Sequence, residues 1–77
     1  MATLNELPLG TWGAIVEVQG ADDVSLRLLE MGMTPGVQVR VLGVAPLGDP
    51  LELELRGYRL SVRRSEAARV AITPLEH

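Results

Sequence analysis

The side chains that most often perform catalysis or bind transition metals are scarce in this sequence. It contains no cysteine, and its single histidine is the last residue, His77. Without cysteine there is no disulfide, no thiol nucleophile and no cysteine-based zinc site. The serines and threonines lack a histidine that could deprotonate them, so an activated hydroxyl nucleophile is not expected. We predict that the protein is not an enzyme and has no catalytic residues.

The last three residues, 75–77, read like the start of a vector-encoded histidine tag. Seven basic and ten acidic residues give a net charge of −3. Excluding the tag residues leaves seven against nine, a net charge of −2, and removes the only histidine. We therefore expect one folded domain over residues 1–74, followed by a tag remnant.

The carboxylates are the remaining candidates for metal ligands, and their spacing does not match a metal-binding loop. Each also has a structural interpretation, as a helix cap, a turn residue or the polar face of a strand. We predict no cofactor and no dedicated metal site; direct binding of ferrous iron by carboxylates, as in a metal sensor, is a weaker hypothesis. The carboxylates in question are Asp22, Asp23, Asp49, Glu52 and Glu54.

All seven basic residues are arginines, and four of them cluster in the second half of the chain. Arg59 and Arg63 are expected to face Glu52 and Glu54 as cross-strand ion pairs. A phosphate-binding surface is the competing interpretation. The acidic net charge and the presence of only two aromatic residues argue against a nucleic-acid partner. The cluster consists of Arg56, Arg59, Arg63 and Arg64.

Most of the chain has the composition or the alternation of β-strands. A helix of about ten residues is predicted after the first strand, because Asp22 can cap its start and Gly32 can end it after Met31. A single helical turn is expected near residues 65–68. The predicted strands cover residues 12–18, 37–41, 51–55, 58–63 and 69–72.

This order of elements predicts a mostly β fold. Five short strands in so small a chain are best arranged as a five-stranded SH3-like barrel, whose closure protects the strand edges. The one short α-helix then lies between the first and second strands. No apolar run is long enough to span a bilayer and no signal peptide is evident, so we expect a soluble, cytoplasmic protein.

One region is more apolar than a solvated surface needs to be. If residues 37–41 bury alternate valines, Leu42 and Val44 point outward, close to Leu47. Met31 and Met33 flank the end of the predicted helix. We predict a partner-binding surface made of Met31, Met33, Leu42, Val44 and Leu47. The equally weighted alternative is that a bulge at Gly43 changes the phase of the strand and returns Val44 to the core.

Three motifs resemble those of a known family. Residues 27–36, Arg-Leu-Leu-Glu-Met-Gly-Met-Thr-Pro-Gly, are similar to a signature of the FeoA family of ferrous-iron transport accessory proteins. Pro-Leu-Gly-Asp-Pro at 46–50 and Val-Arg-Arg-Ser-Glu-Ala at 62–67 agree in order and spacing. The resemblance covers residues 4–73.

The resemblance to FeoA proteins implies a cytoplasmic SH3-like barrel that supports or regulates ferrous-iron transport. Its implied partner is the cytosolic region of a FeoB-type membrane transporter, so that it reaches the membrane only through that partner. A weak homo-oligomer is left open. The same barrel resembles the regulatory SH3-like domain of iron-dependent transcriptional repressors of the DtxR class, which is the alternative function.

Overall fold

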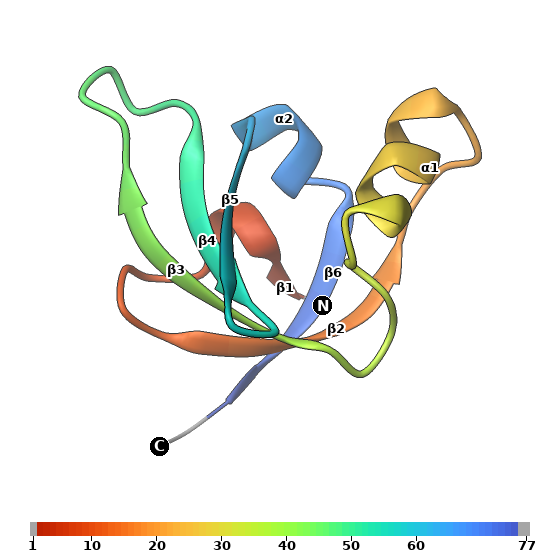
Figure 1. The fold of residues 1–77 in the computed structure, drawn as a ribbon, viewed down its shortest axis with the longest axis horizontal. Coiled ribbons are helices and arrows are strands. Elements are labelled where there is room, and N and C mark those ends of the chain that lie inside the picture. Colours follow the sequence, from red (N-terminus) through yellow and green to blue (C-terminus); the bar gives the residue numbers. More distant parts are fainter. Residues whose placement is uncertain (1, 76–77) are drawn as a thin grey trace.

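The computed structural model describes residues 2–75, which form a single antiparallel sheet accompanied by short helices (Figure 1). The strands are β1 (Ala2–Thr3), β2 (Trp12–Val18), β3 (Gln38–Val44), β4 (Leu51–Leu55), β5 (Tyr58–Val62) and β6 (Val70–Leu75). The helices are the 3₁₀ turn η1 (Leu4–Glu6), α1 (Asp23–Glu30) and the one-turn α2 (Arg64–Ala67). The prediction of a mostly β fold is therefore confirmed.

The strands follow the order β1-β6-β2-β3-β4-β5, and this corrects the prediction of a closed five-stranded barrel. There are six strands, and the two edge strands β1 and β5 do not pair with each other within residues 2–75. The missed strand β1 has only two residues, too few to show an alternation, and it pairs with the distant Ala71 and Ile72. As a result α1 lies between the second and third strands of the chain rather than the first and second.

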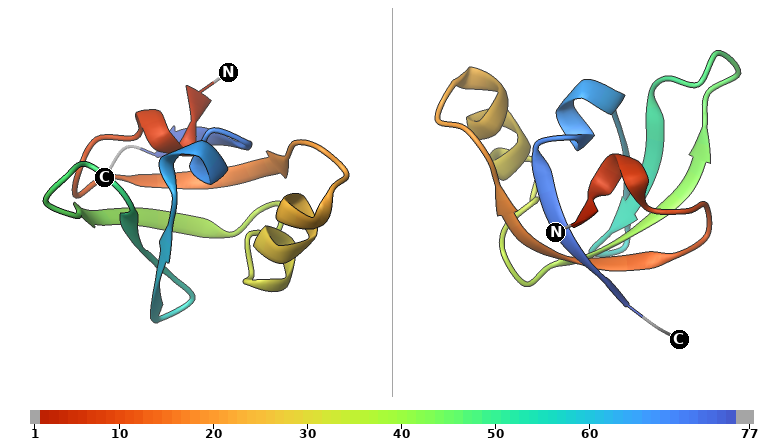
Figure 2. Two further views of the ribbon diagram at one scale, coloured as in Figure 1. Left: turned by 90° about the horizontal axis from the view of Figure 1, so that it is seen from above. Right: turned by 180° about the vertical axis from the view of Figure 1, so that it is seen from behind.

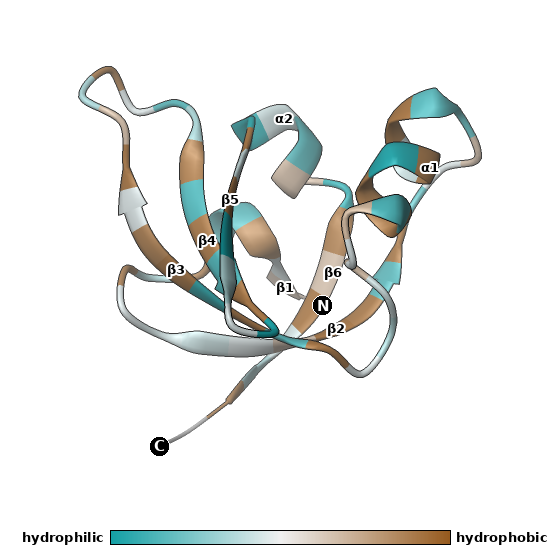
Figure 3. Cartoon of the chain, in the orientation of Figure 1, coloured by the Kyte–Doolittle hydropathy of each residue, from teal (hydrophilic) through white to brown (hydrophobic). Residues whose placement is uncertain are grey.

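The curved sheet encloses an aliphatic core (Figure 2). On β4 the alternation is regular, because Leu51, Leu53 and Leu55 are buried and the two glutamates between them are not. Figure 3 shows the resulting banding of apolar and polar residues along this strand. Burial of alternate side chains is what holds the register of such a strand, since a slip by one residue would expose the whole apolar set.

The strand β3 contains the bulge that the sequence suggested near Gly43. Its register with β4 shifts between Val41 and Gly43, so Leu42 is the additional residue. After the shift Val44 pairs with the buried Leu51 and packs against the core. The alternative interpretation of Val44 is therefore confirmed, and Val44 is half-buried rather than directed to solvent.

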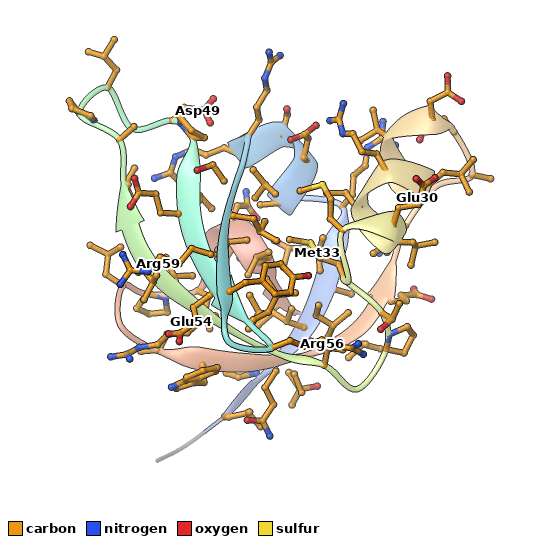
Figure 4. All side chains as sticks on the ribbon, in the orientation of Figure 1. Glu30, Met33, Asp49, Glu54, Arg56 and Arg59 are labelled. Atoms are coloured by element: carbon orange, nitrogen blue, oxygen red, sulfur yellow. The ribbon has the colours of Figure 1, made fainter. Side chains whose placement is uncertain are left out.

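The end of α1 explains why Met33 belongs to the core and not to a surface. Gly32 has φ +103°, its N–H donates to the Leu29 carbonyl, and the Met33 N–H donates to the Leu28 carbonyl. These two hydrogen bonds define a Schellman motif, in which the residue after the glycine contacts the helix three residues before its cap. Leu28 and Met33 are accordingly both buried, as Figure 4 shows for Met33. The prediction that Met33 is exposed was wrong.

The same turn is held against the sheet by Tyr58. Its hydroxyl donates a hydrogen bond to the carbonyl of Met31, the cap residue of α1. A Cβ added to Gly32 would collide with that hydroxyl oxygen, whereas one added to Gly36 would meet no atom within 4 Å. Both glycines have a positive φ, so they differ chiefly in this collision.

We predict that Gly32→Ala destabilises the protein by about 1–2 kcal/mol more than Gly36→Ala. Both substitutions impose an unfavourable backbone conformation, but only the first displaces Tyr58 from Met31. Urea unfolding of the two variants measures the difference. In the Tyr58→Phe background, the difference in unfolding free energy between Gly32→Ala and Gly36→Ala should become smaller. Equal stability of the two single variants would contradict the assigned contact.

Candidate functional site

The loop between β3 and β4 presents the most exposed large apolar side chain of the described residues. Leu47 is 97% exposed. The loop is closed at its base by a hydrogen bond from the Ala45 N–H to the Pro50 carbonyl, and within it the Gly48 N–H donates to the Ala45 carbonyl. Its outer end is coloured hydrophobic in Figure 3. Leu47 is therefore exposed to solvent on a hydrogen-bonded turn.

This loop is also attached to α2. The Asp49 carboxylate accepts a hydrogen bond of 2.9 Å from the backbone N–H of Arg64, and the Arg64 guanidinium donates to the Gly48 carbonyl. A carboxylate at the first residues of a helix satisfies an otherwise unpaired N–H. Two of the motifs noted in the sequence, 46–50 and 62–67, therefore meet in space.

The first motif, 27–36, meets the third through an ion pair. The guanidinium of Arg27 on α1 contacts the carboxylate of Glu66 on α2. The other carboxylate oxygen of Glu66 accepts a hydrogen bond of 3.0 Å from the backbone N–H of Arg63. The Glu66 side chain is only 13% exposed, so both of its oxygens are used in a partly desolvated position. All three motifs consequently converge on α2.

The five residues predicted to bind a partner do not form one surface. Met31 contacts Tyr58 at the turn end of the β4–β5 hairpin, whereas Leu47 precedes β4 at the other end. Met33 is buried, and Val44 and Met31 pack partly on the core. Leu42 is half-buried at the bulge. What the structure leaves near the loop is Leu47, with Leu42 and Val44 on the adjoining strand.

A polar groove of about 540 Å³ lies between α1, the end of β5 and α2. It contains three guanidinium groups and one carboxylate. Arg27 pairs with Glu66, and Arg69 pairs with Asp22. Arg63 takes part in neither of these ion pairs, which are the two found among residues 2–75. The residues that line the groove are Val24, Arg27, Pro50, Ser61, Arg63, Ser65, Glu66 and Arg69.

The predicted arginine cluster is dispersed by the fold. Arg56 lies in the β4–β5 turn, and Arg59 lies opposite Glu54 on the neighbouring strand (Figure 4). The placement of Arg59 opposite Glu54 agrees with the prediction, but Glu52 lies opposite Ser61 rather than Arg63. Neither Arg59 nor Arg63 forms an ion pair with a glutamate of β4. Both aromatic side chains have intramolecular contacts, since Tyr58 bonds to Met31 and the Arg40 guanidinium lies 5.8 Å from the Trp12 ring centroid.

The carboxylates are spread over separate elements. Within residues 2–75 no group of three or more histidine, cysteine, aspartate or glutamate residues is close enough to hold a metal ion. Asp22 is the N-cap of α1, as predicted, because its Oδ1 accepts a hydrogen bond of 3.2 Å from the Ser25 N–H. Of the predicted tag remnant, Leu75 pairs with Trp12 at the end of β6, and Glu76 and His77 lie outside the described residues.

The described helices are all too short to cross a lipid bilayer.

The sequence of this chain is similar to that of known proteins. The model of the FeoA domain matches residues 2–74. The chain belongs to the FeoA family. A fusion of an Fe(2+) transport protein A with the Fe(2+) transporter FeoB, from Porphyromonas gingivalis, is 38% identical over 69 residues, which are 90% of this chain and 8% of that protein.

Solved FeoA structures have the same fold. The solution structure of FeoA from Chlorobium tepidum is 35% identical, with a TM-score of 0.89 over 97% of this chain and 71% of that one. FeoA from Stenotrophomonas maltophilia, described as a zinc complex of an SH3 domain protein, is 37% identical, with a TM-score of 0.83 over 94% of this chain and 89% of that one. The SH3-like class of the fold is thereby confirmed.

The repressor alternative finds support only at the level of fold. The repressor IdeR of T. acidophilum superposes with a TM-score of 0.82 over 95% of this chain and 33% of that one, at 18% identity. Identity this low carries no information on ligands or partners. Among residues 2–75 of this FeoA-family domain, the likeness to a repressor is one of fold alone.

Because of the ion pair of Asp22, the stability of this FeoA-family domain changes with pH in the acid range. The hydrogen bond from Arg69, followed by that from the Ser25 N–H, lowers the pKa of Asp22 from its usual 3.8 to about 2. A carboxyl whose pKa is lowered by folding stabilises the native state above its unfolded pKa. That contribution is lost as the pH falls toward the folded pKa.

We predict that Asp22→Asn lowers the urea midpoint at pH 7, since asparagine keeps the cap acceptor but loses the charge opposite Arg69. The difference from wild type should shrink between about pH 4 and pH 2, where Asp22 itself becomes protonated. Asp23→Asn, which removes a charge from neither ion pair, is the control. A difference that stays constant from pH 7 to pH 2 would contradict the assignment.

Proposed function

We propose that this chain is a small accessory or regulatory protein of ferrous-iron transport, without a catalytic step of its own. The observation that carries the proposal is the relative in which a FeoA part and a FeoB transporter form a single chain. Fusion keeps two modules at a high effective concentration, which benefits modules that work in contact. The proposed partner is accordingly the cytosolic region of a FeoB-type transporter, reached from the cytoplasm.

The proposed docking surface is the β3–β4 loop with the adjoining residues of β3. Leu47 is almost fully exposed, and its loop is held by the contacts of Asp49 and Arg64 with the opposing backbone. A loop whose backbone is already held by hydrogen bonds loses little backbone conformational entropy when a partner covers it. Leu42 and Val44 supply apolar surface beside it. Met33 is excluded because it is in the core.

Co-purification with a FeoB-type transporter tests both the function and the surface. We expect Leu47→Glu to reduce recovery about tenfold or more, as for a central interface residue. The variant should remain folded because Leu47 contacts little of its own chain. Leu26→Glu is the matched control, since Leu26 is a 54% exposed leucine on α1.

The two parts of the proposal fail separately. If the wild-type chain does not bind the transporter, the proposed function is wrong. If wild type and Leu47→Glu bind equally, the function stands and the docking surface is wrong. An equal loss of recovery for Leu26→Glu and Leu47→Glu would also contradict a specific role of the loop in binding.

A further inference from the structure

Within residues 2–75, the edge of the sheet at β5 carries backbone groups without strand partners. The β4–β5 turn consists of Arg56 and Gly57, with φ +51° and +81°, a two-residue turn of the type I′ kind. In such a hairpin the flanking residues, Leu55 and Tyr58, exchange hydrogen bonds, and every second pair after them does the same. The backbone N–H and C=O groups of Arg59 and Ser61 therefore point away from β4.

The end of this edge borders the polar groove. Ser61 and Arg63 line it from the β5 side, Val24 and Arg27 from α1, and Glu66 from α2. At the start of β5, the Tyr58 hydroxyl donates a hydrogen bond to the Met31 carbonyl at the end of α1. An extended segment lying along β5 toward α2 would thus enter the groove.

The charge of the groove selects the kind of segment. Its lining has three arginines and one glutamate, and with Asp22, which pairs with Arg69, the net charge is +1, although the chain as a whole has a net charge of −3. Arg27 and Arg69 already have carboxylate partners, so of the three arginines that line the groove Arg63 is the one without a carboxylate partner among residues 2–75. A carboxylate on an incoming strand would form an ion pair with Arg63.

We infer that β5 and the groove bind an extended acidic polypeptide segment by strand addition. Main-chain hydrogen bonds to Arg59 and Ser61 supply affinity, and a carboxylate near Arg63 supplies selectivity. In one register of self-association, antiparallel pairing of two β5 strands centred on Ser61, Arg59 would lie opposite Arg63, and like charges opposite each other destabilise a sheet. The inference goes beyond the proposed function and does not depend on it.

Nuclear magnetic resonance of the full chain with synthetic peptides tests this inference. The probe is a six-residue peptide of alternating valine and glutamate, which should shift the amide signals of Arg59, Ser61 and Arg63. Two peptides serve as controls: one with lysine in place of glutamate, and the acidic peptide N-methylated at alternate residues, which cannot complete a hydrogen-bonded ladder. Both should bind at least about tenfold more weakly.

Variants separate the two contributions. Arg63→Gln should weaken binding of the acidic peptide about three- to tenfold. Arg56→Gln, which removes the same charge from the distant turn, should have little effect. Ser61→Pro removes an edge N–H that β4 does not use, and it should abolish the binding that Ser61→Thr retains.

Three results would overturn the inference. The first is equal binding of the N-methylated and unmodified peptides, which would mean that no strand is added. The second is equal or tighter binding of duplex DNA at the same signals, which would mean that the groove only attracts polyanions. The third is self-association through β5 in sedimentation experiments, which would mean that the edge belongs to a dimer.

Discussion

The carboxylate of Glu66 is the contact on which the arrangement of the surface depends. Helix α2 has only four residues, and a helix so short has no stability of its own. It is held by the bond of Glu66 to the Arg63 N–H, by the ion pair of Glu66 with Arg27, and by burial of Ala67. Because Arg64 in the same turn anchors Gly48 and Asp49, α2 positions both the β3–β4 loop and one wall of the groove.

The open sheet is the second constraint. An unpaired strand edge is a site of unwanted association, and proteins commonly protect it with charge, with short strands or with covering helices. The edge at β1 has two residues, and the edge at β5 carries Arg59 and is followed by Arg63. Such protection against self-pairing by positive charge leaves the β5 edge open to an acidic segment. The same feature can therefore serve both solubility and recognition.

Much of the fold was predictable because the apolar side chains alternate strictly. The ranges of β2 and β4 agree with the prediction. On β4, Leu51, Leu53 and Leu55 leave no other register that buries them. The glycine that ends α1 is also a sequence signal for a Schellman motif. In that motif the residue after the glycine, here Met33, packs on the helix, so the burial of Met33 was predictable. The strand β1 was not predictable, because two residues show no period and their pairing partners are at the far end of the chain.

The candidate surfaces were less predictable than the fold, because they depend on contacts distant in sequence. Arg27 and Glu66 are in different motifs, and no local pattern indicates that they form an ion pair. The exposure of Leu47 follows from the way in which Arg64 holds the loop. Likewise, the predicted arginines are near one another in sequence, but the extended strand β5 separates Arg56, in the β4–β5 turn, from Arg63 beyond the other end of the strand.

We propose that this FeoA-family chain acts by contact with a partner, through surfaces organised by α2. The most direct measurement is a titration of the isotopically labelled chain with the purified cytosolic region of a FeoB-type transporter, followed by the amide signals of every residue. We expect the changes to concentrate in the loop at residues 45–50 and, if an acidic segment of the transporter is the strand, along β5. Absence of any change at concentrations well above micromolar, or changes confined to the outer surface of β2 and β6, would contradict the account.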